Sequence, residues 1–167
     1  MARPANSVLR LKELTPVQLA YLAGFLDGEG HFAVQRTAQR SNGKHYYVPI
    51  LQVVQAGERG IALVEALYAE VGKVGTLQYQ DRSNLPGNQQ NALQWMLYGA
   101  MVEILCFDLY PYLRLKKRHA EVLMDWPHRK TLGLGMGHGT RPDVEVEALQ
   151  IAAFEELRAL NRRGKVA

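Results

Sequence analysis

The sequence contains almost no cysteine and no long apolar run, and both absences narrow the class of protein. Cys106 is the single cysteine among 167 residues, so no disulfide can form within one chain. It lies in an apolar run, which favours a small core side chain and an intracellular, reducing compartment. No run of about 18 apolar residues is present, so we predict no membrane-spanning helix and no membrane partner.

The chain also lacks the composition of a disordered protein. Hydrophobic residues make up 47% and charged residues 22% of the sequence, which is typical of a globular chain. Its 167 residues are sufficient for one domain with a hydrophobic core, and we predict a single domain over residues 1–167. The net charge of +4 is compatible with a nucleic-acid partner, although many soluble proteins are equally basic.

The most informative part of the chain is residues 22–30, which read Leu-Ala-Gly-Phe-Leu-Asp-Gly-Glu-Gly. Before them, Thr15 and Pro16 are typical of a helix N-terminus, because Thr can cap the first turn and Pro is tolerated at its first position. We therefore predict a helix over about residues 16–28, and we expect Gly28 to help end it.

Small residues recur at every fourth position of this helix, at Ala20, Gly24 and Gly28. Bulky side chains usually hold two helix axes about 8–10 Å apart, so a stripe of small residues allows a second helix to approach closely. Glu29 follows at the negative end of the helix dipole, where a carboxylate is unfavourable unless a divalent cation balances it. The alternative is a solvated Glu after a helix that is capped by glycine.

The remainder of the chain alternates between strand and helix patterns. We predict strands at residues 31–39, 46–55, 76–80 and 93–98, and helices at residues 58–71, about 100–110, 114–126 and 143–162. Asn42-Gly43 favours a hairpin turn, and Pro49 favours an edge position or a bulge in the second strand. The last helix is expected to bury five residues, Leu149, Ala152, Ala153, Leu157 and Leu160. This order predicts an α+β fold without an internal repeat.

Residues 22–30 resemble the signature of the LAGLIDADG homing endonucleases, and this signature occurs once in the chain. The predicted elements are similar to that family's αββαββα core, which has a saddle-shaped antiparallel sheet of four strands. Extra C-terminal helices over about residues 100–162 complete the chain. A single signature implies a homodimer in which two signature helices pack together. The resemblance implies an interface that contains Ala20, Gly24, Phe25, Asp27 and Gly28.

The resemblance also implies an active site that hydrolyses a phosphodiester. Glu29 matches the metal-binding acid of the signature, where the family more often has Asp, and the carbonyl of Gly28 matches a second ligand. The expected metal is Mg²⁺, with Mn²⁺ or Ca²⁺ in its place. Gln55 and Arg59 match polar residues near the cleavage centre, and Lys116 matches a lysine that approaches it. By composition alone, these three are equally compatible with solvated surface side chains.

One face of the predicted sheet carries the side chains that the resemblance places against DNA. A strand period of two puts His31, Ala33, Gln35, Thr37 and Gln39 on one face. Five further candidates are Arg40, Lys44, Gln52, Gln78 and Gln80. A Gln amide can bind adenine with two hydrogen bonds in the major groove, although a Gln-rich face is also compatible with simple solvation. Positions 78 and 80 are often basic in the family, so a relative's DNA target cannot be transferred.

These expectations converge on a homing endonuclease, a homodimer that makes a metal-dependent staggered cut in a long pseudo-palindromic site of double-stranded DNA. Its gene would lie in an intron or an intein, and it would act in the cytoplasm or in an organelle that contains DNA. The alternative is a maturase that binds intron RNA, with or without nuclease activity. A non-catalytic DNA-binding regulator is disfavoured because Glu29 is retained. A histidine–metal nuclease is disfavoured because the five histidines show no ligand spacing.

Overall fold

The computed structural model describes residues 11–37, 45–82, 84, 86–87, 89–127 and 144–162. Several predictions lie outside these residues, namely the hairpin turn at Asn42-Gly43 and the DNA-binding candidates Gln39, Arg40 and Lys44. None of the helices that the structure describes is long and apolar enough to cross a membrane.

The described residues form five helices and four strands. In chain order these are α1 Pro16–Glu29, β1 His31–Arg36, β2 Tyr47–Ala56, α2 Gly57–Glu70, β3 Thr76–Gln80, β4 Ala92–Tyr98, α3 Ala100–Leu109, α4 Lys117–Met124 and α5 Val144–Leu160. The strands form one antiparallel sheet in the order β1-β2-β4-β3. The predicted α+β class and the order of its elements are confirmed.

The start of α1 is fixed by two reciprocal hydrogen bonds. The backbone N–H of Gln18 donates to the hydroxyl of Thr15 at 3.3 Å, and the Gln18 side-chain oxygen accepts the Thr15 N–H at 2.9 Å. This capping box pairs two backbone N–H groups that a helix start otherwise leaves without partners. The predicted start of the signature helix at Thr15-Pro16 is therefore confirmed.

The end of α1 differs from the prediction by one residue. The helix continues through Gly28 to Glu29, so Gly28 does not end it. The N–H of Gly30 donates to the carbonyl of Leu26 at 2.9 Å and closes the last turn. A Cβ added at Gly30 would lie 2.7 Å from that carbonyl oxygen, so only glycine fits there. Glu29 consequently sits on the helix itself, with its orientation set by the final turn.

One hydrophobic core fills the space between the sheet and the helices. Leu22 and Leu26 of α1 pack there with Phe32 of β1, Val53 of β2 and Trp95 of β4, and each is at most 2% exposed. Burial of one such side chain contributes about 1.5–3 kcal/mol. This core fixes the end of α1 against the first two strands.

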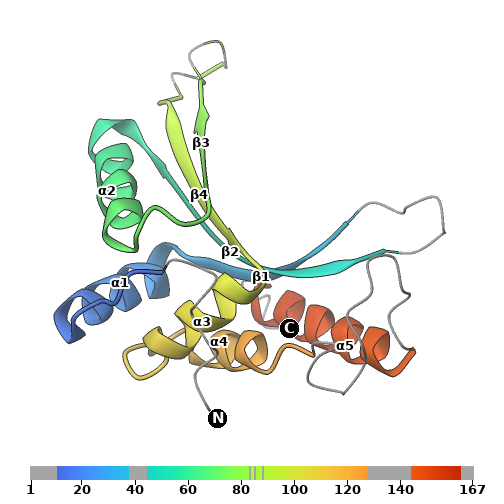
Figure 1. Cartoon of the computed structure of the whole chain (residues 1–167). Helices are drawn as coiled ribbons and strands as arrows, with labels where there is room; N and C mark the ends of the chain where they lie inside the picture. The colour runs from blue at the N-terminus through green and yellow to red at the C-terminus, as the bar shows by residue number, and fades with distance from the viewer. Residues whose placement is uncertain are drawn as a thin grey trace.

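The face of the sheet opposite to this core is called the open face here. Phe32 and Val34 point into the core, so their neighbours along β1 point the other way. Figure 1 shows α1, α3, α4 and α5 below β1 and β2, and α2 beside the upper part of the sheet. By strand register the open face carries His31, Ala33 and Gln35, then Ile50, Gln52 and Val54, then Thr76, Gln78 and Gln80, and finally Gln94, Met96 and Tyr98.

Pro49 lies where β2 has a neighbouring strand on one side only. It pairs with Val34 of β1, whereas the pairing of β2 with β4 begins one residue later, at Ile50 and Tyr98. The carbonyl of Pro49 accepts the N–H of Gly99 at 2.9 Å, so the hydrogen-bonding side of the Pro49 backbone faces the end of β4. The missing N–H of Pro49 therefore interrupts no ladder, although β2 itself is an inner strand.

The predicted buried stripe of α5 is largely wrong. Leu149 and Leu160 are 51% and 39% exposed, whereas Leu157 is 1% exposed. The face of α5 that meets the sheet also carries Phe154, whose ring lies 5.5 Å from the ring of Tyr47. The contact with β1 and β2 therefore selects a different face of the helix from the one that the apolar spacing indicated.

Candidate functional site

Glu29 lies at the end of α1 beside the end of β2. Its Oε2 atom accepts a hydrogen bond from Nε2 of Gln55 at 3.0 Å. The two residues are 26 positions apart in sequence, so the packing of α1 against the sheet brings them together. The side chain of Glu29 is exposed, which leaves its carboxylate accessible to solvent and ions.

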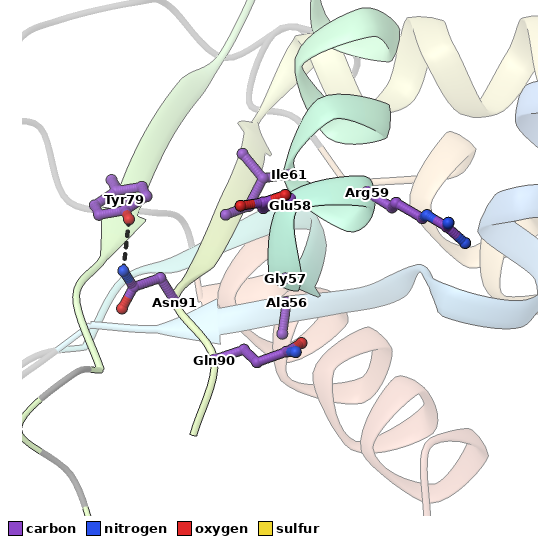
Figure 2. A pocket seen from close by; sticks show the side chains of 8 residues that line it. All are labelled: Ala56, Gly57, Glu58, Arg59, Ile61, Tyr79, Gln90 and Asn91. Atoms are coloured by element: carbon purple, nitrogen blue, oxygen red, sulfur yellow. Dashed lines mark hydrogen bonds between the residues drawn. The ribbon is translucent and has the colours of Figure 1, made fainter. Parts of the chain in front are cut away.

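The first turn of α2 leaves room for Gln55 and carries Arg59. A Cβ added at Gly60 would lie 3.0 Å from Cβ of Gln55 and 3.4 Å from its Oε1 atom, so the glycine lets the amide lie against the helix start. Figure 2 shows the exposed Arg59 extending away from Tyr79 and Asn91, which are joined by a hydrogen bond of 2.8 Å. The two predicted residues thus flank one strand–helix junction.

Lys116 reaches the same end of α1 from the C-terminal half of the chain. Its ammonium group donates a hydrogen bond to the carbonyl of Gly30, the residue after Glu29. It also lies 6.0 Å from the centre of the Phe32 ring. Desolvation and the positive charge of Lys116 together lower the pKa of His31. The ammonium group of the predicted lysine is thereby held at the residue that follows Glu29, the predicted metal ligand.

Asp27 holds the loop that carries Lys116. One of its carboxylate oxygens accepts the backbone N–H of Arg114 at 2.7 Å, and the other accepts that of Lys116 at 2.9 Å. A helix predicted from residue 114 begins only at Lys117, directly after the two N–H groups that bind Asp27 of α1. Asp27 is one of the residues predicted for a dimer interface, whereas in the structure its carboxylate binds N–H groups of its own chain.

The oxygen atoms at the end of α1 suit a hard divalent cation but are few. Among the residues that the structure describes, no group of three or more His, Cys, Asp or Glu side chains lies together. Glu29 supplies a carboxylate, and the carbonyl of Gly28 belongs to the last turn, whose final carbonyls have no partner within the helix. Mg²⁺ and Ca²⁺ take such oxygen ligands, and Mg²⁺ usually keeps several waters. The residues therefore fit such an ion only if further oxygen ligands come from outside the chain.

The small-residue stripe of α1 faces open space. The exposed residues on this face of α1 are the small Ala20, Gly24 and Gly28 of the stripe and the larger Val17 and Tyr21 beside them. A Cβ added at Gly24 or Gly28 would meet no atom within 4 Å beyond the helix's own backbone. Val17 and Tyr21 are 79% and 56% exposed although they are large and apolar. Phe25, the other predicted interface residue, is half-buried against the core.

Most of the predicted DNA-binding residues have accessible side chains. Those that are exposed or half-exposed are His31, Gln35, Thr37, Gln52, Gln78 and Gln80. The hydroxyl of Thr37 accepts the N–H of Tyr46 at 2.9 Å. Ala33 is only 9% exposed, so little of its methyl group is accessible, and its contact with a base stays a prediction.

Gln80 is held by its neighbours on the open face. Its Nε2 atom donates to Oε1 of Gln94 at 2.7 Å, and Arg82 donates to its Oε1 atom at 2.5 Å. Nε2 of Gln94 in turn lies 2.9 Å from Sδ of Met96. A base that binds Gln80 must replace these hydrogen bonds, whereas Gln78 is exposed on the same strand.

A known family matches the segment of the chain that contains the residues of this candidate site. The sequence model of the LAGLIDADG endonuclease family matches residues 22–120, which is more than half of the chain. The chain belongs to the LAGLIDADG family. A comparison with curated protein sequences gave no match.

Solved structures of homing endonucleases share the fold of this LAGLIDADG chain. The homing endonuclease I-CvuI, in complex with the I-CreI target in 2 mM Mg, has 18% identity and a TM-score of 0.63, over 90% of this chain and 86% of that one. I-CvuI in complex with its own target in 2 mM Ca has 20% identity and a TM-score of 0.64, over 89% and 85%. I-GzeII in complex with a DNA target has 17% identity and a TM-score of 0.58, over 84% and 43%.

Two residues of this LAGLIDADG chain escaped the sequence analysis as site residues. Gln94 lies on the open face directly opposite Gln78, and the alternation of β4 between Leu93 and Leu97 is the signal that identifies it. His119 of α4 is 8% exposed, and its Nδ1 atom has no hydrogen-bond partner. Burial lowers the pKa of His119, and the nearby charge of Lys116 lowers it further. No sequence pattern marks this histidine, because its environment comes from packing.

Proposed function

We propose that this protein is a homing endonuclease that acts as a homodimer and makes a metal-dependent staggered cut in a long pseudo-palindromic DNA site. The observation that carries the proposal is the meeting of Glu29, Gln55 and Lys116 at the end of α1, beside a stripe that faces open space. The gene would lie in an intron or an intein, as in the family that the chain belongs to.

The exposed stripe of α1 supports the dimer. A second copy that packs its α1 against this stripe would cover Val17 and Tyr21 and would use the open space at Gly24 and Gly28. The same contact would bring the two Glu29 carboxylates together at the two-fold axis. Such a symmetric pair calls for a target whose two halves are related by the same symmetry.

The residues around Glu29 support phosphodiester hydrolysis. Glu29 and the carbonyl of Gly28 would hold Mg²⁺, or Mn²⁺ or Ca²⁺ in its place, which activates water and stabilises the departing oxygen when bound. Gln55 fixes the Glu29 carboxylate and can orient a water molecule. Lys116 brings a positive charge to the region where a scissile phosphate would lie. Arg59, on the first turn of α2, would contact phosphate or order solvent.

The open face supports recognition of double-stranded DNA. Its exposed glutamines can donate to and accept from base edges, and a curved sheet fits into the major groove. The structures of I-CvuI and I-GzeII are complexes with DNA targets, and this chain shares their fold. The net charge of +4 doubles in a dimer, which would strengthen binding to phosphates at low salt.

A cleavage assay on a library of duplex targets, with and without Mg²⁺, tests the proposal. We expect both strands of a selected site to be cut in Mg²⁺ and left intact in a chelator. Tight binding of a selected duplex without any nick would rule out the endonuclease. Tight binding of intron RNA under the same conditions would then support the maturase.

Gly24→Leu tests the dimer. Among the described residues, a Cβ added at Gly24 would meet no atom within 4 Å beyond the helix's own backbone, so we expect the monomer to fold normally, as judged by circular dichroism. We expect light scattering to give the mass of a dimer for the wild type and of a monomer for the variant. Ala62→Leu, on an exposed position of α2, is the matched control and should stay dimeric. A wild-type monomer at working concentration would contradict the shared active site.

A further inference from the structure

The carboxylate of Asp27 binds a distant loop with both of its oxygens. The N–H groups of Arg114 and Lys116 donate to the two oxygens at 2.7 Å and 2.9 Å. Donors and acceptor are 87 and 89 positions apart in sequence. Hydrogen bonds of this kind, with an ionised acceptor, are about twice as strong as neutral ones. Asp27 thus ties the start of the α4 region to the end of α1.

The loop is anchored at two further points. Leu113 is 3% exposed and packs into the core just before the two bound N–H groups. The ammonium group of Lys116 donates to the carbonyl of Gly30. Backbone and side chain of Lys116 are therefore both attached to the last turn of α1, which also carries Glu29. A shift of the loop would move the lysine relative to that carboxylate.

The position of Asp27 on α1 fits this contact better than a contact with a second copy. At about 100° per residue, Asp27 lies about 60° from Gly24, on the side away from Gly28. Asp27 lies between the exposed stripe and the buried Leu26, and its own side chain is half-buried. Each of its two oxygens already accepts one backbone N–H of its own chain, so fewer acceptor sites remain for a partner helix.

We propose that Asp27 is a positioning residue that fixes Lys116 beside Glu29 and thereby sets the charge at the cleavage centre. This role rests on the proposed nuclease function, in which Lys116 faces the scissile phosphate. In this role Asp27 acts through the loop that it binds and not through a contact with the substrate or a metal. The last turn of the signature helix then supplies two functions, a metal ligand at Glu29 and a positioning residue at Asp27.

Asp27→Asn is the principal test variant. An Asn side chain keeps the size but can accept only one of the two N–H groups, because its other terminal atom is itself a donor. We expect the cleavage rate at saturating DNA to fall by about tenfold or more, equivalent to about 1.4 kcal/mol, while the KM for DNA changes little. Asp27→Glu keeps both acceptors on a longer stem and should recover part of the rate. Glu65→Gln, with the same charge change on an exposed position of α2, should behave as the wild type.

A double-mutant cycle distinguishes a positioning role of Asp27 from a general loss of structure. Lys116→Met removes the amine, and if Asp27 acts through that amine, adding Asp27→Asn should cause no further loss of rate. A full additional loss in the double variant would overturn the proposal. A change from dimer to monomer in Asp27→Asn, measured by light scattering, would assign Asp27 to the interface and overturn it as well.

An NMR titration of His119 gives a readout that does not depend on cleavage. Burial lowers the pKa of His119 most and the charge of Lys116 lowers it further, so Lys116→Met should raise this pKa. If Asp27 holds the lysine in place, Asp27→Asn should raise the pKa of His119 in the same direction. An unchanged value in Asp27→Asn, with a raised value in Lys116→Met, would show that Asp27 does not position the amine. Because this measurement needs no DNA, it stands even if the protein proves not to be a nuclease.

Discussion

At the end of α1, side chains from distant parts of the sequence bind one another, whereas on the open face most of the predicted reading residues project from single strands. Gln55 binds Glu29, and Asp27 binds the loop of Lys116. On the open face, His31 and Gln35 take their direction from the strand period alone. The first region holds its groups in fixed relative positions, and the second presents groups that can be exchanged one at a time.

This difference indicates how each region tolerates change. A substitution at the end of α1 should disturb several partners at once, because each bond there ties one element to another. Apart from Gln80, which is bound to Gln94 and Arg82, a substitution on the open face should alter one contact and leave the rest in place. Phosphodiester chemistry needs the first kind of arrangement, since misplaced groups lose rate steeply. Recognition of a new target sequence needs the second kind.

The largest expected effect is that of Glu29→Gln. The variant keeps the shape and the amide can still pair with Gln55, but the charge that would hold a cation is lost. We expect cleavage to fall by at least about 100-fold, the usual cost of removing one preorganised electrostatic group. DNA affinity, measured by fluorescence anisotropy in Ca²⁺, should be mostly retained. Cutting at the wild-type rate would remove Glu29 from the active site.

A smaller and more local effect is expected for Gln35→Ala on the open face. Loss of one bidentate contact to a base costs about 1–3 kcal/mol of discrimination at one position of the site. Competition binding against all single-base variants of a selected target measures this loss. The cleavage rate at saturating DNA should stay unchanged. A uniform loss of affinity across all variants would instead assign Gln35 to the DNA backbone.

Gly60→Ala tests whether the placement of Gln55 matters. The added Cβ would lie 3.0 Å from Cβ of Gln55, so the amide must shift by a few tenths of an ångström. We expect the cleavage rate to fall by about tenfold or less. Alanine stabilises a helix by about 1 kcal/mol relative to glycine, so the melting temperature should hold or rise. An unchanged rate would show that Glu29 does not need this amide.

The smallest effect concerns pH and His119. Its pKa in the folded protein lies below the ordinary value of 6.5, so the unfolded chain binds more protons near that pH. Stability is therefore fully present above pH 6.5 and declines as the pH falls from 6.5 toward the folded pKa. His119→Phe should flatten this decline in urea unfolding curves recorded across that range. An equally steep decline in the variant would assign it to other groups.

The sequence predicted the fold well because its signals are local. Apolar spacing, Thr15-Pro16 and the alternation of strands determine helices and strands without reference to distant residues. The errors arose where distant residues intervene. The start of α4 lies at Lys117 rather than at residue 114, after a loop that binds Asp27 of α1, and the contact with the sheet selected a different face of α5 from the predicted one.

The candidate site likewise has a part that the sequence predicted and a part that required the structure. The signature at residues 22–30 and the register of Gln55 and Lys116 predicted the candidate site residues from sequence. The resemblance to a known family suggested the roles of these residues. Their spacing alone is also compatible with solvated side chains on an ordinary surface. The pairing of Glu29 with Gln55, the engagement of Gln80 and the burial of Ala33 required the structure.

By itself, the sequence determined which elements form, which residues are small enough for a close helix contact, and where the acidic residue at the end of α1 falls. Only the tertiary structure decided which partners these residues find. Asp27 is an example, because nothing local distinguishes an acid that faces a second chain from one that binds a loop 87 residues away. Local signals act through the backbone of a few neighbouring residues, whereas partners are chosen by the packing of the whole core.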